Sequence, residues 1–230
     1  MDMKVVVLTG GISTERDVAL SSGKMIYEAV KKNGHQAVLL DVYLGYTGED
    51  ARGIFEKEED WAKEIGEIGI KNPEIEAVKA LRPDGDKNFF GPNVISICQG
   101  ADVVFMALHG ENGENGKIQA CFDLMGITYT GTDYVSSALC MDKELAHRTV
   151  KQKGVPVPDS CVIRKPYDAL QVWTEAKKLG YPLFVKPVRS GSSFGITMVQ
   201  QEEALIPALE HAFWHDTMVV MEERIDGREV

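Results

Sequence analysis

Short apolar runs alternate along the chain with segments in which apolar residues recur every three or four positions. The first run covers residues 5–8, and after Gly10 and Gly11 apolar positions follow at helical spacing from residue 18 to residue 30. A second apolar run, "AVLLDV", occupies residues 37–42. Strand, helix and strand in this order predict a β-α-β unit with a right-handed crossover.

The next strong pattern begins at residue 103. Residues 103–108 form an uninterrupted apolar run, which is typical of a strand covered on both faces. A helical pattern over residues 118–125 ends at Gly126, and "ITYTG" after it predicts a short strand. Residues 45–92 show only a weak helical signal around residues 59–68, so an irregular segment is expected there. Together these elements predict a small parallel α/β layer.

A new helical pattern begins in the stretch "MDKELAHRTVKQKG", residues 141–154. It predicts a helix with Asp142 as its N-cap, ended by Gly154. The expected buried stripe of this helix consists of Leu145, Ala146, Thr149 and Val150.

The rest of the chain predicts an α+β unit. A stiff "VPVPDS" linker leads to the strand "CVIR", a helix over residues 167–179 and the strand "PLFVKP". A glycine- and serine-rich loop, the strand "ITMV", a helix over residues 202–213 and the strand "TMVVMEE" follow, with the loop closing a hairpin. The expected domains are residues 1–141 and 142–230.

Composition narrows the classes of partner. The 230 residues carry a formal net charge of −10, which argues against a nucleic-acid or anionic-membrane surface because no basic stripe is present. No apolar stretch approaches the ~20 residues that span a bilayer. The four cysteines stand singly, without the spacing of a metal site or a disulfide scaffold, so a reduced, cytoplasmic compartment is expected.

The stretch "VKPVRSGSSFGIT" carries the clearest candidate chemistry. Lys186 ends an apolar strand, and the loop after it offers backbone N–H groups and the hydroxyls of Ser190, Ser192 and Ser193 to an anion. These residues could form a phosphate clamp. A β-hairpin with a solvated serine tip explains them equally well.

Three other positions have two interpretations each. Glu15, at the start of the first helix, either neutralises the helix dipole or meets a cationic group of a ligand. Lys143 lies in the first turn of a helix, where the dipole opposes a cation, yet solvated surface lysines are common. His109 ends a buried strand, where open α/β sheets bind ligands, or is simply hydrogen-bonded in a turn.

Dinucleotide binding is the rival interpretation of the first motif. Asp41 stands where a ribose-binding acid would be expected, but Gly10 and Gly11 lack the spacing of GxGxxG. Because the glycine spacing of the motif is missing, the sequence argues against dinucleotide binding despite Asp41.

Five motifs in order resemble the D-alanine:D-alanine ligases of the ATP-grasp superfamily. They are "GGISTERDVALSSG", "ALHGENGENGKIQACFDLMGITYTG", "SSALCMDK", "GYPLFVKPVRSGSSFGIT" and "MEERIDGREV". "SSALCMDK" with "KPVRSGSSFGIT" looks most like the branch of the D-alanine:D-serine ligases. The resemblance implies an α/β fold, a Rossmann-like N-terminal layer for the substrate followed by the first, α+β part of an ATP-grasp nucleotide clamp.

The resemblance also implies a role for particular residues toward the amino acid. Glu15 would meet the ammonium group of the first D-alanine, and His109 would stand near the same substrate. Ser192 would link to Glu15 by hydrogen bonds.

Toward ATP, the resemblance implies that Lys143 and Lys186 contact the α- and β-phosphates. Ser192 and Ser193 would lie in the loop that closes over them. Glu222 would accept a hydrogen bond from the adenine amino group.

The last motif completes the nucleotide site that the resemblance implies. The backbone of Glu223 and Ile225 would read the purine edge, and Glu229 would hold the ribose. Glu223 departs from the family because this hinge position is often basic. No metal ligand is assigned within this chain, since the family's Mg²⁺ ligands would follow Val230; the chain looks truncated, and by itself it is expected to be inactive.

The implied function is an ATP-dependent ligase that joins two D-alanines through a D-alanyl phosphate to make D-alanyl-D-alanine for peptidoglycan precursors. A cytoplasmic homodimer is implied as well. Three alternatives stay open: a D-alanine:D-serine ligase, another ATP-grasp carboxylate-amine ligase, and a non-catalytic nucleotide-binding fragment.

Overall fold

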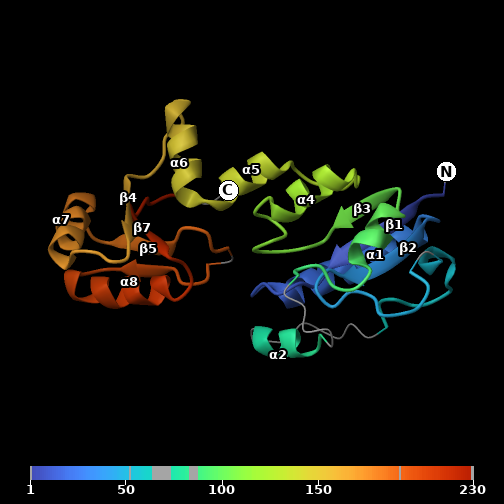
Figure 1. The fold of residues 1–230 in the computed structure, drawn as a ribbon. Coiled ribbons are helices and arrows are strands. Elements are labelled where there is room, and N and C mark those ends of the chain that lie inside the picture. The colour runs from blue at the N-terminus through green and yellow to red at the C-terminus, as the bar shows by residue number, and fades with distance from the viewer. Residues whose placement is uncertain (1, 52, 64–73, 83–87, 192, 229–230) are drawn as a thin grey trace. The chain divides into compact units, whose positions relative to one another are not determined.

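The chain folds into two compact units, each with its own sheet and core. The computed structural model describes residues 2–51, 53–63, 74–82, 88–191 and 193–228. The units are Met1–Ser136 and Ser137–Val230 (Figure 1). The division falls inside helix α5 (Tyr134–Met141), and the domain limits expected from the sequence, 1–141 and 142–230, stay a prediction.

The first unit is built on a parallel sheet. Strand β1 (Lys4–Thr9) lies between β2 (Gln36–Asp41) and β3 (Val103–Met106), and both pairings are parallel. Helix α1 (Arg16–Lys32) connects β1 to β2. The predicted strand-helix-strand order and the third parallel strand are therefore confirmed.

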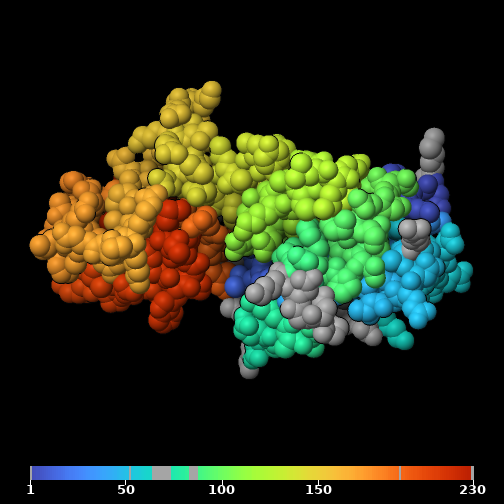
Figure 2. Space-filling view, viewed as in Figure 1, coloured from blue at the N-terminus to red at the C-terminus, as the bar shows by residue number. Residues whose placement is uncertain are grey.

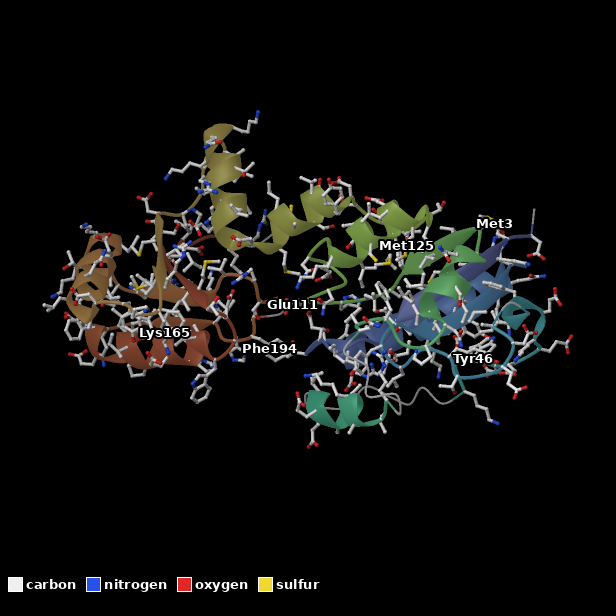
Figure 3. The ribbon with its side chains drawn as sticks, in the orientation of Figure 1. Met3, Tyr46, Glu111, Met125, Lys165 and Phe194 are labelled. Atoms are coloured by element: carbon white, nitrogen blue, oxygen red, sulfur yellow. The ribbon has the colours of Figure 1, made fainter. Side chains whose placement is uncertain are left out.

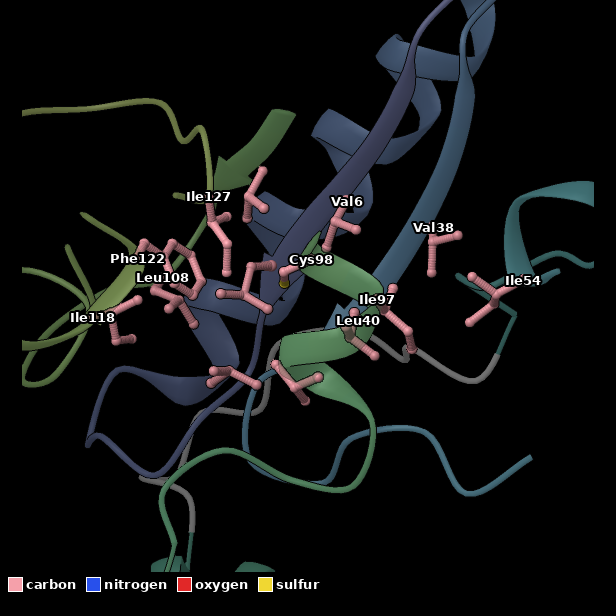
Figure 4. Packing of buried hydrophobic residues seen from close by; sticks show 14 of the residues in the cluster. Val6, Val38, Leu40, Ile54, Ile97, Cys98, Leu108, Ile118, Phe122 and Ile127 are labelled. Atoms are coloured by element: carbon pink, nitrogen blue, oxygen red, sulfur yellow. The ribbon is translucent and has the colours of Figure 1, made fainter. Parts of the chain in front are cut away.

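Both faces of this sheet are covered, which explains the uninterrupted apolar runs. On one face, Val6 and Leu40 pack with Ile97 and Cys98 of α3 (Val94–Gln99) (Figure 4). On the other, Val5 and Val7 of β1 pack with Tyr27 of α1. Burial at every position of a strand removes the alternation that a half-exposed strand would show.

Two expectations for the first unit are corrected. "ITYTG" forms only an isolated bridge between Val104 and Tyr129, because Met106 N donates to the Thr130 hydroxyl (3.1 Å) in place of a backbone carbonyl and the ladder ends. Helix α3 follows Asn93 and was not predicted. Helix α4 (Lys117–Met125) ends at Gly126, with φ 67°, as expected.

The segment expected to be irregular contains two short helical elements, η1 (Ile54–Glu56) and α2 (Ile75–Ala80). The weak helical signal at residues 59–68 falls largely outside the described residues, since only positions 59–63 are described, and 61–63 form a turn.

The second unit is built on an antiparallel sheet in the order β4-β7-β5-β6. Its strands are β4 (Ser160–Arg164), β5 (Leu183–Pro187), β6 (Thr197–Val199) and β7 (Met218–Glu223). Its covering helices are α7 (Ala169–Leu179) and α8 (Leu205–Phe213), the latter preceded by the single turn η2 (Glu202–Ala204). The predicted β5–β6 hairpin and the α+β character are confirmed.

Alternation along these strands separates an apolar face from a polar one. Val185, Val219 and Met221 belong to the core shared with α7 and α8. Because successive side chains point to opposite faces, Lys186 and Glu222 lie on the other face of the sheet. The functional side chains of this unit are found there.

Helix α6 (Lys143–Gln152) corrects another expectation. Asp142 caps it, accepting from Leu145 N at 3.0 Å, as predicted. The expected stripe is not buried, however: no residue of α6 is fully buried, and Leu145 is 38% exposed. The yellow segment near residue 150 stands out from its unit in Figure 2. Polar side chains of α6 make contacts with the rest of the unit: Lys143 with the loop after β5, Glu144 with Arg164 of β4, and His147 with Glu222 of β7.

Candidate functional site

The turn after β1 is held by a buried ion pair. Arg16 donates to the carbonyl of Gly11 and lies 2.5 Å from Asp41 Oδ2 at the end of β2. The other Asp41 oxygen accepts from the N–H groups of Tyr43 (2.8 Å) and Leu44 (3.0 Å). Both carboxylate oxygens of Asp41 are bonded inside the fold, so Asp41 is a structural residue. It is therefore not available to bind a ribose, as the dinucleotide interpretation requires.

Glu15 is positioned at the start of α1 without capping it. It occupies the N-cap position, yet its side chain makes no capping hydrogen bond. Its half-buried carboxylate lies against Gly110, where a Cβ would fall 2.6 Å from Oε2. Gly110 adopts φ 76°, a left-handed backbone conformation that favours glycine, and its missing Cβ leaves space beside that carboxylate.

Ser13 ties the glycine turn to the end of β3. Its Oγ donates to the His109 carbonyl at 2.7 Å and accepts from Glu15 N at 3.1 Å. The His109 ring is held separately, with Nε2 3.0 Å from Ser22 Oγ on α1. The structure therefore brings Glu15 and His109, which are far apart in sequence, into one cluster with two serines.

In the second unit, an ion pair stands on the polar face of the sheet. Lys186 Nζ lies 2.5 Å from Glu222 Oε1, and Glu222 is only 6% exposed. His147 Nε2 lies 3.8 Å from the other oxygen of Glu222, while its Nδ1 is buried with no partner among the described residues. The carboxylate is therefore flanked by a lysine and a histidine.

Lys143 lies in the same neighbourhood and is not a solvated surface lysine. Its Nζ donates to the carbonyls of Ser190 (2.6 Å) and Val188 (3.4 Å) in the loop after β5. Burial lowers the pKa of Lys143, and the nearby positive charge of Lys186 lowers it further. Two ammonium groups that repel one another form a site for a multiply charged anion. A polyphosphate fits this pair.

The loop after β5 uses several of its own donors internally. Arg189 N donates to Asp216 (2.8 Å), and Phe194, at the tip of the loop in Figure 3, donates its N–H to Gly191 O (3.1 Å). Ser193 is exposed with φ 61°. Ser192 lies outside the described residues. The lysines, more than these amides, supply the positive charge of the candidate clamp.

The end of β7 carries the remaining predicted nucleotide residues. Glu223 N donates to Asp159 O (3.0 Å), and the Glu223 carboxylate accepts from Asp159 N (2.8 Å). The amide N–H of Glu223 is thus engaged within the unit, whereas Ile225 is 62% exposed. Glu229 lies outside the described residues.

Within the described ranges, no three His, Cys, Asp or Glu side chains gather as a metal site. None of the described residues is therefore assigned as a Mg²⁺ ligand. Of the helices in those same ranges, none is both long and apolar enough to cross a membrane.

Sequence reasoning missed four residues that hold these sites. Ser13, Ser22 and Arg16 give no local signal, since short polar residues and an arginine near a helix start are common. His147 does give one: it follows Lys143 by four positions, so the two share a helix face.

A parallel α/β layer followed by an antiparallel sheet with two lysines beside a buried glutamate is the arrangement of the ATP-grasp class, and solved structures of that fold match the whole chain. Residues 4–132 match the family model described as D-ala D-ala ligase N-terminus, and residues 149–230 match D-ala D-ala ligase C-terminus. The chain belongs to the D-alanine–D-alanine ligase family.

Individual relatives agree with this assignment. The chain is 38% identical to D-alanine–D-alanine ligase of Lacticaseibacillus casei and 35% identical to the vancomycin/teicoplanin A-type resistance protein VanA of Enterococcus faecium. In both cases the match covers 99% of this chain and 62% of the relative. The chain thus spans less than two thirds of the length of these curated relatives.

Solved structures give the same result. The VanG D-Ala:D-Ser ligase of Enterococcus faecalis matches with a TM-score of 0.69 and 34% identity, over 99% of this chain and 64% of that one. The D-alanine–D-alanine ligase of Bacillus anthracis complexed with ATP matches with a TM-score of 0.66 and 27% identity, over 99% and 58%.

Proposed function

We propose that this protein is the substrate- and nucleotide-binding part of an ATP-dependent ligase that joins two D-alanines. The observation that carries the proposal is the pair of clusters: Glu15 with His109 in one unit, and Lys143 with Lys186 and Glu222 in the other. The first offers a carboxylate and an imidazole to an amino acid. The second offers two ammonium groups and a carboxylate to a purine nucleotide.

In the proposed reaction, ATP phosphorylates the carboxylate of the first D-alanine, and the amine of the second displaces phosphate from the acyl phosphate to form the dipeptide. Residues of the chain bind and orient these groups. Glu15 holds the ammonium group of the first amino acid by a charge-assisted hydrogen bond. Lys143 and Lys186 neutralise phosphate charge, and positioning of this kind is the main contribution of a protein to phosphoryl transfer.

Glu222 would recognise the adenine. It lies on the face that carries Lys186, which bonds its Oε1, and its Oε2 lies 3.8 Å from His147 Nε2, beyond hydrogen-bond distance. The exocyclic amino group of adenine is a donor that fits such an oxygen. The exposed backbone near Ile225 would meet the purine edge. The roles expected for Ser192 and Ser193 in the loop over the phosphates, and for Glu229 at the ribose, stay predictions.

The division of labour follows the two units. We assign the amino acid to the domain expected over residues 1–141 and the nucleotide to residues 142–230. A cytoplasmic location, a homodimer, Mg²⁺ dependence and a role in peptidoglycan synthesis stay predictions; cell fractionation, light scattering and chelation of the active enzyme would test the first three.

The deciding experiment measures ADP formation and product mass with the longest protein that the gene encodes. D-alanine-dependent ADP release with formation of D-alanyl-D-alanine supports the proposal. A nucleotide-binding fragment without activity would give no D-alanine dependence, and another carboxylate-amine ligase would respond to a different acid. The 230-residue chain, assayed in parallel, is expected to show background turnover only.

The similarity to the VanG D-Ala:D-Ser ligase favours one second candidate. Competition between D-alanine and D-serine as second substrate, read by the mass of the product, separates the two ligases. A mixed dipeptide in excess over D-alanyl-D-alanine would select the D-alanine:D-serine ligase.

A further inference from the structure

The ring of His109 has one structural partner, the hydroxyl of Ser22. The two are 87 positions apart in sequence, and Nε2 lies 3.0 Å from Ser22 Oγ. The backbone of His109 is fixed as well, because its carbonyl accepts from Ser13 Oγ at 2.7 Å. Both ends of the residue are therefore anchored to the segment that begins with the glycine turn.

A contact of this length has two possible proton arrangements. Either the Ser22 hydroxyl donates to an unprotonated Nε2, or Nε2–H donates to Ser22 Oγ. In the second arrangement the hydroxyl proton needs another acceptor. For a serine inside a helix that acceptor is usually the carbonyl four residues earlier.

The surroundings of Ser22 favour the first arrangement. Thr174 in α7 shows the usual alternative, donating to Leu170 O at 2.8 Å. Ser22 makes no such bond: in the part of the chain that the structure describes, its hydroxyl is bonded to His109 alone. Only donation to Nε2 gives that hydroxyl proton an acceptor within the fold.

The protonation state of the other ring nitrogen follows. In a neutral imidazole one nitrogen carries the proton and the other accepts, and the partner of one nitrogen sets which form is present. With Nε2 accepting, Nδ1 carries the proton. Nδ1 forms no hydrogen bond with the described residues, and His109 as a whole is half-buried.

We propose that Ser22 is a positioning residue that holds His109 in the Nδ1–H form, so that His109 donates a hydrogen bond to a carboxylate oxygen of the bound amino acid and does not act as a general base. The carboxylate of Glu15 belongs to the same cluster, because its Oε2 lies against Gly110, the residue after His109. The cluster then offers an acceptor for the ammonium end of an amino acid and a donor for its carboxylate end. The substrate part of this inference rests on the proposed ligase function.

Nitrogen NMR of the chain labelled with 15N-histidine tests the protonation state without any assay of activity. The spectrum is recorded at about pH 8.5, where ordinary histidines are neutral, and His109→Gln identifies the signals. We expect a protonated-type shift at Nδ1 and an unprotonated-type shift at Nε2. Ser22→Ala should lose this pattern, and Ser22→Thr, which keeps the hydroxyl, should retain it.

Ser21→Ala is the matched control, because Ser21 is the adjacent, equally half-buried serine without a described hydrogen bond. It should leave the His109 signals unchanged. An Nε2–H form in the parent chain, or the same pattern in Ser22→Ala as in the parent, would overturn the proposal.

Kinetics with the longest protein that the gene encodes test the consequence. Ser22→Ala should raise the KM for the first D-alanine roughly two- to tenfold, the equivalent of one neutral hydrogen bond, and leave the KM for ATP unchanged. An unchanged D-alanine KM would overturn the positioning role. Absence of D-alanine turnover in the parent and every variant would refute the ligase function instead, and the NMR result would still decide the protonation state.

Discussion

The ammonium nitrogen of Lys186 lies 2.5 Å from Oε1 of Glu222, across the neighbouring strands β5 and β7. Lys186 pairs with Val220 in the register, and Glu222 pairs with Phe184, so the two side chains are diagonal neighbours on one face. Glu222 is nearly fully buried, and a buried carboxylate depends on its cationic partner. The residue proposed to bind phosphate therefore also stabilises the residue proposed to bind adenine.

Lys186→Met should lower both stability and nucleotide affinity. Removing the ammonium leaves the buried Glu222 carboxylate without its hydrogen-bonded cationic partner, which should cost about 1 to 3 kcal/mol of unfolding free energy. Urea unfolding and calorimetric titration with ATP measure the two effects.

The double variant Lys186→Met/Glu222→Gln separates them. It removes the buried charge and should recover part of the stability without recovering ATP affinity. Lys178→Met, at an exposed lysine paired with Glu175, is the control and should change neither quantity. Parental ATP affinity in Lys186→Met would remove Lys186 from the nucleotide site.

Glu15→Gln in the longest protein that the gene encodes should raise the KM for the first D-alanine far more than the KM for ATP. A charge-assisted hydrogen bond contributes about 1.5 to 3 kcal/mol, so a loss of roughly ten- to a hundredfold in kcat/KM is expected. Steady-state kinetics with each substrate varied in turn provide the measurement.

Asp17→Asn tests the helix-dipole alternative, because Asp17 is the acidic residue in the first turn of α1. It should leave the D-alanine KM unchanged. Equal effects of the two substitutions would show that Glu15 acts only on the dipole of the helix.

As the pH is raised, the affinity for ATP should begin to fall at a pH below the one at which an ordinary lysine loses its charge. Burial and the charge of Lys186 lower the pKa of Lys143, so Lys143 loses its positive charge at a pH below the usual lysine range. Attraction for phosphate is present below that pKa and is lost as the pH rises through it. Titration with ATP across the alkaline range measures the effect.

Lys143→Arg is the comparison, since arginine stays charged throughout. Its ATP affinity, whatever its absolute value, should be flatter with pH than that of the parent. Parallel pH curves for the two proteins would contradict a role for the Lys143 charge in nucleotide binding.

Asp216→Asn should destabilise the second unit. Burial disfavours the charge of Asp216, but hydrogen bonds from Arg189 and Met218 outweigh burial and hold its pKa below the ordinary value. Loss of these charge-assisted bonds should cost about 1 to 3 kcal/mol, measured by thermal or urea unfolding.

The pH dependence of that cost has a definite sign. A carboxyl whose folded pKa is depressed contributes stability above its unfolded pKa and loses it as the pH falls through the folded pKa. The difference between parent and Asp216→Asn should therefore be full near neutral pH and shrink in acid. A difference independent of pH would show that the charge of Asp216 contributes nothing.

Local patterns predicted most of the elements because local contacts produce them. The apolar run of β1, the Asp142 cap of α6 and the Gly126 end of α4 each depend on residues within one or two turns. Where the outcome depended on a distant partner, prediction failed. The strand expected at "ITYTG" was cut to a single bridge when the Thr130 hydroxyl took the N–H of Met106.

The expected buried stripe of α6, of which Leu145 is exposed and Ala146, Thr149 and Val150 are only half-buried, illustrates the same limit. Helical spacing marks an apolar face at Leu145 but does not say which face meets the sheet. Lys143 and His147 face the rest of the unit, because the carbonyl of Ser190 in the loop after β5 and the carboxylate of Glu222 in β7 are their partners. Those partners lie 47 and 75 positions further along the chain, beyond the reach of any periodicity.

By itself the sequence determined the two kinds of sheet and the order of their strands along the chain, because the periods of strands and helices and the positions of glycines depend on neighbouring residues. It also indicated the family, through five motifs in order. Only the tertiary structure decided which polar residues meet. It turned Asp41 inward to Arg16, set Ser22 against His109 and joined Lys186 to Glu222. Hydrogen bonds and ion pairs require contact within a few ångströms, and only folding brings distant residues that close.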